Sequence, residues 1–412
     1  MMPTRFTMSD LAAVLPPGGR TFVQGCSAQS TILAEAVAIA GEALGAMTFT
    51  GIQVPGINRD DWLANPACRF ETFFMTPELK AAGNSVTFLP FCYADILSHL
   101  RETSIDAALF SVSPPDANGM CSFGPTVDYL ADIWPSIPRR IAHINPLLPP
   151  TSGPTGIPFE AIHAVIEGEA ALPEAPDGRA DPVSLAIAGH VAALIGDGST
   201  IQTGLGKLPG AVLRLLADRR DLHIHSGLIG DAVLDLLDCG AIAEGAHVTA
   251  GVAMGTRRLY DALPGSGIRF HPVSHTHAPE ILARIPGFVT VNAAIAVDLY
   301  GQAFAEATEH GWNSGSGGAT DFARGARGAR AGGGVRIVAL PGTAKTSSRI
   351  IAPGTGRGPV SLGRMDIDIV VTEHGAADLR GLSHDGRAAA LVAVAAPDHR
   401  ETLARAWRNG SP

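Results

Sequence analysis

The sequence predicts an α/β fold made of two similar domains with mainly parallel sheets. Residues 18–33 (GGRTFVQGCSAQSTIL) and 197–212 (DGSTIQTGLGKLPGAV) each contain an apolar strand, a glycine turn and a helix-forming stretch. This strand-turn-helix unit is the building block of parallel sheets. Two further apolar runs, 106–113 (DAALFSVS) and 366–372 (DIDIVVT), end in Ser or Thr, as buried parallel strands do.

The two copies of the unit suggest where the chain divides. A length of 412 residues normally makes more than one domain. Residues 168–184 (GEAALPEAPDGRADPVS) are rich in Pro, Ala and acidic residues, as linkers are. We therefore expect one domain over 1–178 and a second over 183–412. The alternative is that the two copies share only the ordinary composition of turns between strands and helices.

Three other segments can be interpreted from their patterns. Residues 221–226 (DLHIHS) predict a strand, and 231–238 (DAVLDLLD) predict a helix that Asp231 caps. Residues 113–124 (SPPDANGMCSFG) predict a loop because turn-forming residues dominate them.

Composition excludes several classes of function. The chain is 46% hydrophobic and 17% charged, which is typical of a compact globular protein, and its net charge of −9 argues against nucleic acid as a partner. Five cysteines without close spacing favour free thiols in a reducing cytoplasm. The N-terminus lacks the apolar core of a signal peptide, and no uncharged run is long enough to span a bilayer. We expect a cytoplasmic protein without a membrane partner.

A glycine cluster is the first candidate for chemistry. Ser314, Gly315, Ser316, Gly317 and Gly318 form a stretch with almost no side-chain bulk, ahead of a segment where a helix could start. Such a backbone can approach a ligand closely and direct N–H groups at a developing oxyanion. The alternative is a flexible loop without a function of its own.

Longer motifs surround this cluster. Residues 291–302 (VNAAIAVDLYGQ), 337–350 (IVALPGTAKTSSRI) and 369–381 (IVVTEHGAADLRG), together with the loop at 113–124, resemble the acetyl-CoA hydrolase/transferase family. That family includes the 4-hydroxybutyrate, acetate and butyrate CoA-transferases. The resemblance implies two domains of the class I CoA-transferase type with an active cleft between them. It also implies acyl-CoA as the substrate, with coenzyme A as substrate or product, and a small carboxylic acid as a second partner. A homodimer is left open.

The chain departs from this family where the family's chemistry occurs. The family carries a nucleophilic glutamate in a pattern like H-T-E-M-F-S-D-G, and the matching stretch here places Gly227 at the glutamate position. Glycine has no side chain, so it cannot form the acyl anhydride or the glutamyl thioester. Phe304 stands where the family has an asparagine. We include Gly227 and Phe304 among the substrate-contacting positions.

Other residues could replace the missing glutamate. Glu373 follows a strand in V-T-E-H-G, at the sheet edge where α/β proteins place ligands, and could activate water. A structural, salt-bridged Glu373 is the alternative. Asp231 is a candidate as well, although a residue in its position is more often a helix cap. Cys26 lies at a strand-helix turn and could be a nucleophile if its pKa were lowered. We therefore assign Glu373, Gly317 and Gly318 as catalytic.

Basic residues near these motifs are candidates for binding the phosphates of CoA. Arg324, Arg327 and Arg330 repeat every three residues and would share one helix face, which is usually only solvated. Lys345 and Arg349 are comparable candidates, because cationic side chains pair with phosphate.

Two other kinds of site are not supported. His223 and His225, and the group at 271, 275 and 277, lack the carboxylate or cysteine spacing of a zinc signature, so we expect no metal. Gly204, Gly206 and Gly210 miss the dinucleotide fingerprint because Pro209 stands at the third glycine position.

The favoured function is hydrolysis of an acetyl-CoA-like thioester by water, without a glutamyl intermediate. Gly315–Gly318 would stabilise the oxyanion, Glu373 would activate water, and Ser314 and Ser316 would line the binding site. Transfer to a small carboxylic acid through another carboxylate is one alternative. A CoA-ester-binding regulatory protein without catalysis is the other.

Overall fold

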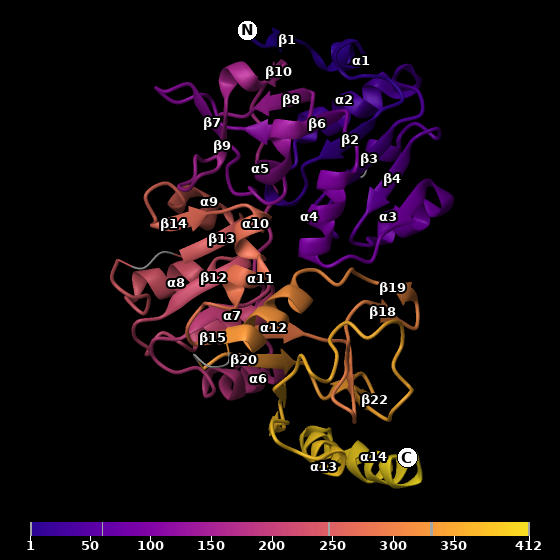
Figure 1. Cartoon of the computed structure of the whole chain (residues 1–412), viewed down its shortest axis with the longest axis vertical. Helices are drawn as coiled ribbons and strands as arrows, with labels where there is room; N and C mark the ends of the chain where they lie inside the picture. Colours follow the sequence, from indigo (N-terminus) through magenta and orange to yellow (C-terminus); the bar gives the residue numbers. More distant parts are fainter. Residues whose placement is uncertain (1, 60, 246–247, 330–332, 411–412) are drawn as a thin grey trace. The chain divides into compact units, whose positions relative to one another are not determined.

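The computed structural model describes residues 2–59, 61–245, 248–329 and 333–410. These residues form two compact units, which are described separately. Unit 1 comprises Met1–Ala175 and Thr249–Thr276, and unit 2 comprises Pro176–Val248 and His277–Pro412. Both are of the predicted α/β type, and Figure 1 shows their strands and helices along the chain. The expected domain bounds, 1–178 and 183–412, stay a prediction.

The large sheet of unit 1 has the order β1-β10-β8-β6-β2-β3-β4-β5. Its neighbouring strands pair in parallel, as predicted. Every residue of β6 is buried, which explains its continuous apolar sequence. The strands are β1 (Thr4–Arg5), β2 (Arg20–Val23), β3 (Thr48–Gly51), β4 (Arg69–Thr72), β5 (Val86–Phe88), β6 (Ala107–Val112), β8 (Arg139–Ile144) and β10 (Ala164–Glu167).

The remaining elements of unit 1 include a short strand in the predicted 113–124 loop. There β7 (Met120–Ser122) pairs antiparallel with β9 (Gly156–Pro158), so a short strand interrupts the loop. Strand β13 (Val248–Ala253) begins at the border of this unit, and β14 (Ile268–Phe270) lies within it. The helices are α1 (Leu11–Val14), α2 (Thr31–Ala40), α3 (Pro77–Ala81), α4 (Tyr93–Glu102), α5 (Leu130–Ile133), α9 (Arg257–Ala262) and α10 (Val273–Thr276).

In unit 2, six strands follow one another in the order β12-β11-β15-β20-β24-β25. All of these pairs are parallel except that of β24 with β25. The strands are β11 (Thr200–Gln202), β12 (His223–Ile229), β15 (Phe288–Ala293), β20 (Val335–Ala339), β24 (Ile369–Thr372) and β25 (Gly375–Asp378). Strand β12 runs three residues beyond its predicted end, so it includes Gly227.

The predicted repeat is confirmed by the strand order. In unit 1, β2 lies between β3 and β6, and β8 and β10 continue outward from β6. In unit 2, β11 lies between β12 and β15, and β20 and β24 continue outward in the same way. The two repeated segments therefore occupy equivalent central positions, each with its strand followed by a helix.

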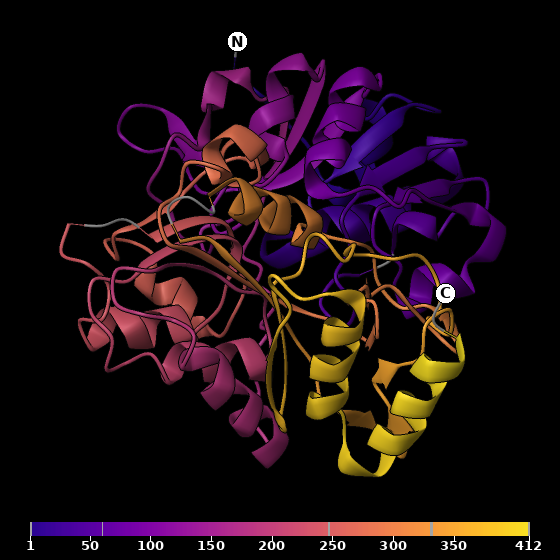
Figure 2. The same ribbon diagram turned by 60° about the horizontal axis from the view of Figure 1, so that its bottom comes forward.

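Small strands and helices complete unit 2. A three-stranded sheet, β17-β16-β23, and the β18–β19 and β21–β22 hairpins lie outside the main sheet. Their bounds are β16 (Ala296–Asp298), β17 (Ala303–Phe304), β18 (Ala307–Thr308), β19 (Gly311–Trp312), β21 (Thr343–Ala344), β22 (Ser347–Ser348) and β23 (Ile350–Ile351). The helices are α6 (Pro182–Ala192), α7 (Lys207–Arg214), α8 (Ala232–Asp238), α11 (Pro279–Leu282), α12 (Ala319–Gly328), α13 (His384–Val394) and α14 (Pro397–Gly410). The two C-terminal helices pack against each other (Figure 2).

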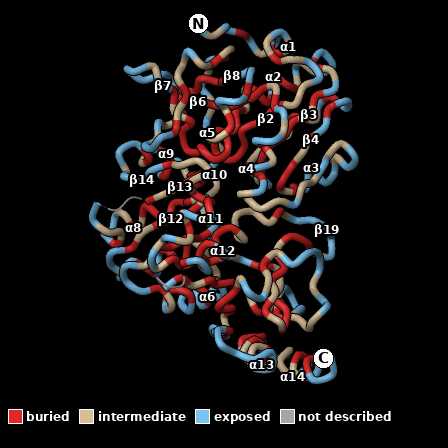
Figure 3. Tube along the Cα trace, viewed as in Figure 1, coloured by how far each residue is buried: buried red, intermediate tan, exposed pale blue. Residues whose placement is uncertain are grey.

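Burial follows the strands within each unit (Figure 3). Helix α12 packs on β15 and β20 and against α11. Gly325 makes this close approach possible, because a Cβ there would overlap Leu282. Phe288, Phe322 and Leu282 form a small core under α12. This packing holds the start of α12, and with it the glycine cluster, over the sheet.

Candidate active site

The glycine cluster ends where α12 begins. Gly318 is the N-cap residue of α12, and its carbonyl accepts a hydrogen bond from the N–H of Phe322 at 3.0 Å. Gly317 has a φ of 58°, a conformation that glycine adopts without strain. The first N–H groups of a helix have no partner within the helix, so they are available to a developing negative charge. The helix expected after the cluster is confirmed.

Gly227 and Gly318 both lie against the imidazole ring of His277, near its Nε2 atom. A Cβ on Gly227 would come within 2.6 Å of His277 Cε1, and a Cβ on Gly318 would come within 2.5 Å of His277 Nε2. The ring of Phe322 lies against both glycines and has its centroid 4.6 Å from that of His277. The structure therefore brings two predicted site positions together around a histidine that the sequence did not single out for this role.

His277 is an uncharged histidine at neutral pH. Its side chain is buried, and burial, helped by the neighbouring His225, lowers its pKa to about 3. Desolvation disfavours the charged form of histidine, so the imidazole stays neutral. The ring fills the space beside Gly227 without adding a charge to it. His225 in turn packs edge-on against Phe288, with the ring centroids 6.1 Å apart.

Glu373 directly follows β24, as expected, and holds the loop after the neighbouring strand. Its Oε2 accepts a hydrogen bond from the backbone N–H of Gly342 at 2.7 Å. Its Oε1 lies 3.5 Å from Nε2 of His374. These contacts give Glu373 a structural role at the carboxyl edge of the sheet, and they leave lone pairs of the carboxylate available to a water molecule.

Arg349 and Glu373 both form hydrogen bonds with Gly342, in the loop after β20. Its backbone N–H donates to the carbonyl of Gly342 at 2.9 Å, and its own carbonyl accepts from Val297 at 2.8 Å. Burial lowers the pKa of Arg349, and its Nε is a buried donor without a hydrogen-bond partner among the described residues. An arginine donor left unsatisfied in this way is suited to an anionic ligand.

The other predicted binding residues divide between surface and core. Lys345 is exposed in the turn between β21 and β22, with a φ of 54°, and Arg324 is exposed on α12. Arg327 lies 3.9 Å from Asp366, and Arg330 lies outside the described residues. Phe304 is buried in β17, and its ring lies so close to Gly356 that a Cβ there would overlap it. The contacts described for Phe304 are those of a packed core residue.

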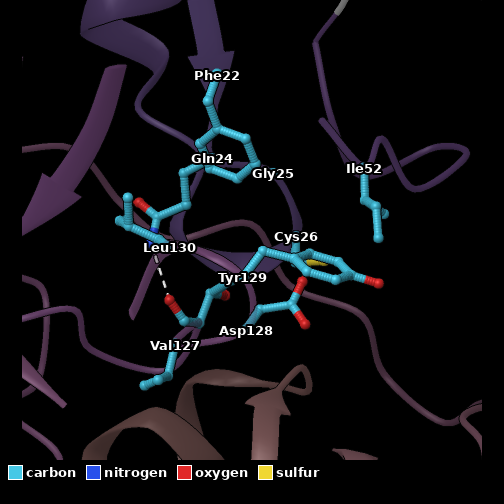
Figure 4. Close-up of a pocket in the computed structure, with 10 residues that line it drawn as sticks. Phe22, Gln24, Gly25, Cys26, Ile52, Val127, Asp128, Tyr129 and Leu130 are labelled. Atoms are coloured by element: carbon cyan, nitrogen blue, oxygen red, sulfur yellow. Dashed lines mark hydrogen bonds between the residues drawn. The ribbon is translucent and has the colours of Figure 1, made fainter. Parts of the chain in front are cut away.

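Two weaker candidates, Asp231 and Cys26, have other surroundings. Asp231 directly precedes α8, but the backbone N–H of Ala232 is engaged by Asp177. Cys26 is buried in unit 1 beside Asp128, and burial, followed by the charge of Asp128, raises the pKa of its thiol (Figure 4). A thiol in that state is a poor nucleophile, because the thiolate is the reactive form.

The histidines and the glycine turn can now be placed. Among the described residues, no group of three His, Cys, Asp or Glu side chains could hold a metal ion, and the expectation of no metal stays a prediction. His271 and His275 stack on each other in unit 1, with their centroids 4.1 Å apart. Gly206 ends the turn after β11, and α7 starts at the next residue, as expected for a strand-helix turn.

Within the described parts of the chain, no helix has the length and apolar character needed to cross a bilayer.

Two α/β units with equivalent strand orders, and a glycine-lined site at the start of α12, define a class I CoA-transferase fold. Solved structures of other proteins share this fold. RipA from Yersinia pestis matches with a TM-score of 0.90 and 27% identity, covering 98% of this chain and 97% of that one. The 4-hydroxybutyrate CoA-transferase from Porphyromonas gingivalis matches with a TM-score of 0.83 and 28% identity over the same shares.

Sequence comparisons give the family. Residues 255–407 match the acetyl-CoA hydrolase/transferase C-terminal domain. The 4-hydroxybutyrate coenzyme A transferase of Clostridium kluyveri is 34% identical over 81% of this chain and 81% of its own length. An acetyl-CoA hydrolase of Yarrowia lipolytica is 26% identical over 74% of this chain and 66% of its own length. The chain belongs to the acetyl-CoA hydrolase/transferase family. The two relatives named above are enzymes.

Proposed function

We propose that this protein hydrolyses acyl-CoA thioesters by direct attack of water, without a glutamyl-CoA intermediate. One observation carries the proposal: residue 227 has no side chain, and the ring of His277 occupies the space that a side chain would need. A covalent intermediate at this position requires a carboxylate that the chain does not have there.

The remaining residues can be given roles in this reaction. The backbone N–H groups at Gly317 and Gly318 would stabilise the oxyanion that forms when water attacks the thioester carbonyl. Glu373 would accept the proton of that water, the C–S bond would break, and the CoA thiolate would leave and then be protonated. Arg349, whose buried Nε lacks a partner among the described residues, would hold a phosphate or carboxylate of the substrate.

Transfer of CoA to a small carboxylic acid is a second candidate. The 34% identity to a 4-hydroxybutyrate coenzyme A transferase favours it. In this version the acceptor carboxylate attacks the thioester carbonyl in place of water, which gives a mixed anhydride and CoA thiolate. The thiolate then attacks the acceptor's own carbonyl, forms the new thioester and releases the first acid as a carboxylate. A catalytically inactive CoA-ester-binding protein is a third candidate, which the existing contacts of Glu373 with Gly342 and His374 favour. A position of the site between the two units stays a prediction.

A panel of acyl-CoAs tests these candidates, with release of free CoA measured with and without acetate or succinate as acceptor. Hydrolysis predicts release without an acceptor and one solvent oxygen in the released acid when the water is labelled with oxygen-18. Release only with an acceptor would identify a transferase. Binding of acyl-CoA, seen as a raised melting temperature, without release would identify an inactive binder.

The role of Glu373 needs its own variant. Glu373→Gln keeps an oxygen that can accept from Gly342 but removes the base, so kcat should fall by about 100-fold or more with little change in melting temperature. Glu401→Gln is the matched control, because Glu401 is exposed and forms an ion pair with Arg405 along α14. An unchanged kcat in Glu373→Gln would remove Glu373 from the mechanism.

A further inference from the structure

A polar cavity lies in unit 2, away from the glycine cluster. It has a volume of about 330 Å³, within the range of small-molecule sites. Among the described residues, its lining contains five arginines and one carboxylate, that of Asp368. This excess of positive charge stands out in a chain whose net charge is −9. The lining arginines are Arg327, Arg336, Arg364, Arg380 and Arg387.

Three of these arginines are already matched by carboxylates. Arg336 is buried and makes a bidentate pair with Asp368, at 2.9 Å from Nε and 2.6 Å from Nη2. Arg380 pairs in the same way with Asp378. Arg327 lies 3.9 Å from Asp366. Their charges are compensated within the protein, so they add little attraction for a ligand.

Arg364 and Arg387 are not matched in this way. The guanidinium of Arg387 donates to three backbone carbonyls, those of Tyr300, Leu379 and Arg364, at 3.3, 3.1 and 2.9 Å. The side chain of Arg364 makes no hydrogen bond or ion pair with any described residue. Burial, followed by the charge of Arg364, lowers the pKa of Arg387. The charge of Asp368 opposes this shift but does not cancel it. Two guanidinium groups therefore repel each other at the cavity, and among the described residues neither forms an ion pair with a carboxylate.

The cavity is at the opposite edge of the sheet from the candidate active site. Arg336 and Asp368 lie at the amino ends of β20 and β24, whereas Gly342 and Glu373 follow the carboxyl ends of the same strands. Four residues of β24, at about 3.3 Å each, separate the two edges by roughly 13 Å. The glycine cluster likewise precedes α12, whereas Arg327 belongs to its last turn.

We infer that this cavity binds a small anion carrying two or more phosphate groups, at a site separate from the one proposed for acyl-CoA. A phosphate oxygen between Arg364 and Arg387 relieves their repulsion and accepts charge-assisted hydrogen bonds from both. Arginine presents a planar fork that fits phosphate bidentately, and the cavity volume of about 330 Å³ leaves room for a second phosphate. The inference does not depend on the proposed hydrolysis.

Isothermal titration of the full-length protein with pyrophosphate tests the inference. We expect saturable binding that Arg364→Ser weakens at least about tenfold, because a charge-assisted hydrogen bond is lost. Arg405→Ser is the control, since it removes one exposed arginine from α14 and should leave binding unchanged. No saturable binding, or equal weakening in both variants, would overturn the inference. Arg387→Lys keeps the charge but not the fork and should also weaken binding.

Other titrants identify the ligand class and the separateness of the site. Succinate, which carries two carboxylates, should bind more weakly than pyrophosphate, and equal binding would overturn the preference for phosphate. Acetyl-CoA also carries phosphates, so its Kd is measured in the same variants. An unchanged Kd for acetyl-CoA in Arg364→Ser supports a separate site, whereas a parallel loss would make the cavity part of the acyl-CoA site and overturn that claim.

Discussion

The imidazole of His277 lies against the backbone of Gly227, so closely that a Cβ on residue 227 would come within 2.6 Å of its Cε1 atom. Real Cβ atoms are not found at such distances, so any side chain at 227 requires movement of the ring. The His277 ring also contacts Phe322 and lies close to Gly318. The lack of a side chain at residue 227 and the buried His277 ring are therefore one structural feature and should be changed together in experiments.

The first prediction tests this coupling with the smallest side chain. Gly227→Ala should lower the free energy of unfolding by about 1–3 kcal/mol, because it overpacks a filled site. In a His277→Ala background the same change should cost much less, since the ring is gone. Urea denaturation of the wild type, both single variants and the double variant gives the coupling energy. Additive losses would show that the two residues do not compete for one space.

The second prediction concerns a buried carboxyl group in unit 1. Burial, followed by the charge of Asp132, raises the pKa of Asp128 to about 8, well above the unfolded value of about 3.9. The folded state therefore holds a proton that the unfolded state releases between these two pKa values. This contribution to stability is complete below about pH 4 and is lost as the pH rises towards 8.

Asp128→Asn should remove that part of the pH dependence. Asparagine keeps a hydrogen-bonding side chain, does not ionise, and tolerates the φ of 39° at this position. Unfolding free energies measured from pH 5 to 9 should fall for the wild type and fall less steeply for the variant. Parallel curves for the two proteins would mean that Asp128 does not carry a raised pKa.

Much of the fold could be predicted because parallel strands and the turns after them have local signatures. The apolar run at 106–113 and the two strand-turn-helix copies became β6, β2 and β11, in equivalent sheet positions. The glycine cluster before α12 was also predictable from its composition. These features depend on residues that are neighbours in sequence.

The candidate site was less predictable because its contacts join distant segments. His277 lies 50 positions after Gly227 and reaches it only through the packing of Phe322 and the start of α12. Glu373 holds Gly342, on the loop of a different strand, which no local pattern could indicate. The ring of Phe304 packs against Gly356, which lies 52 positions later in the chain, and its contact with substrate stays a prediction. Such contacts follow from tertiary structure alone.

The third prediction concerns the buried ion pair of unit 2. Asp368→Asn removes the charge partner of Arg336, whose side chain is only 6% exposed, and should lower the free energy of unfolding by about 3–5 kcal/mol. The matched control is Asp378→Asn, because its pair with Arg380 is solvent-exposed and should contribute less than about 1 kcal/mol. Denaturant midpoints measure both. Equal effects would contradict the importance of burial for the first pair.

The last prediction restores the family's nucleophile. Gly227→Glu alone should give no covalent adduct, because the ring of His277 blocks the glutamate side chain. Gly227→Glu combined with His277→Ala keeps the total side-chain volume similar, which packed sites tolerate best. After incubation with acyl-CoA and reduction with borohydride, the peptide 221–235 should be modified in the double variant and unmodified in the wild type. The single variant distinguishes the two explanations: an adduct formed by Gly227→Glu alone would show that His277 yields readily, and that the absent carboxylate is the sole barrier to the covalent route.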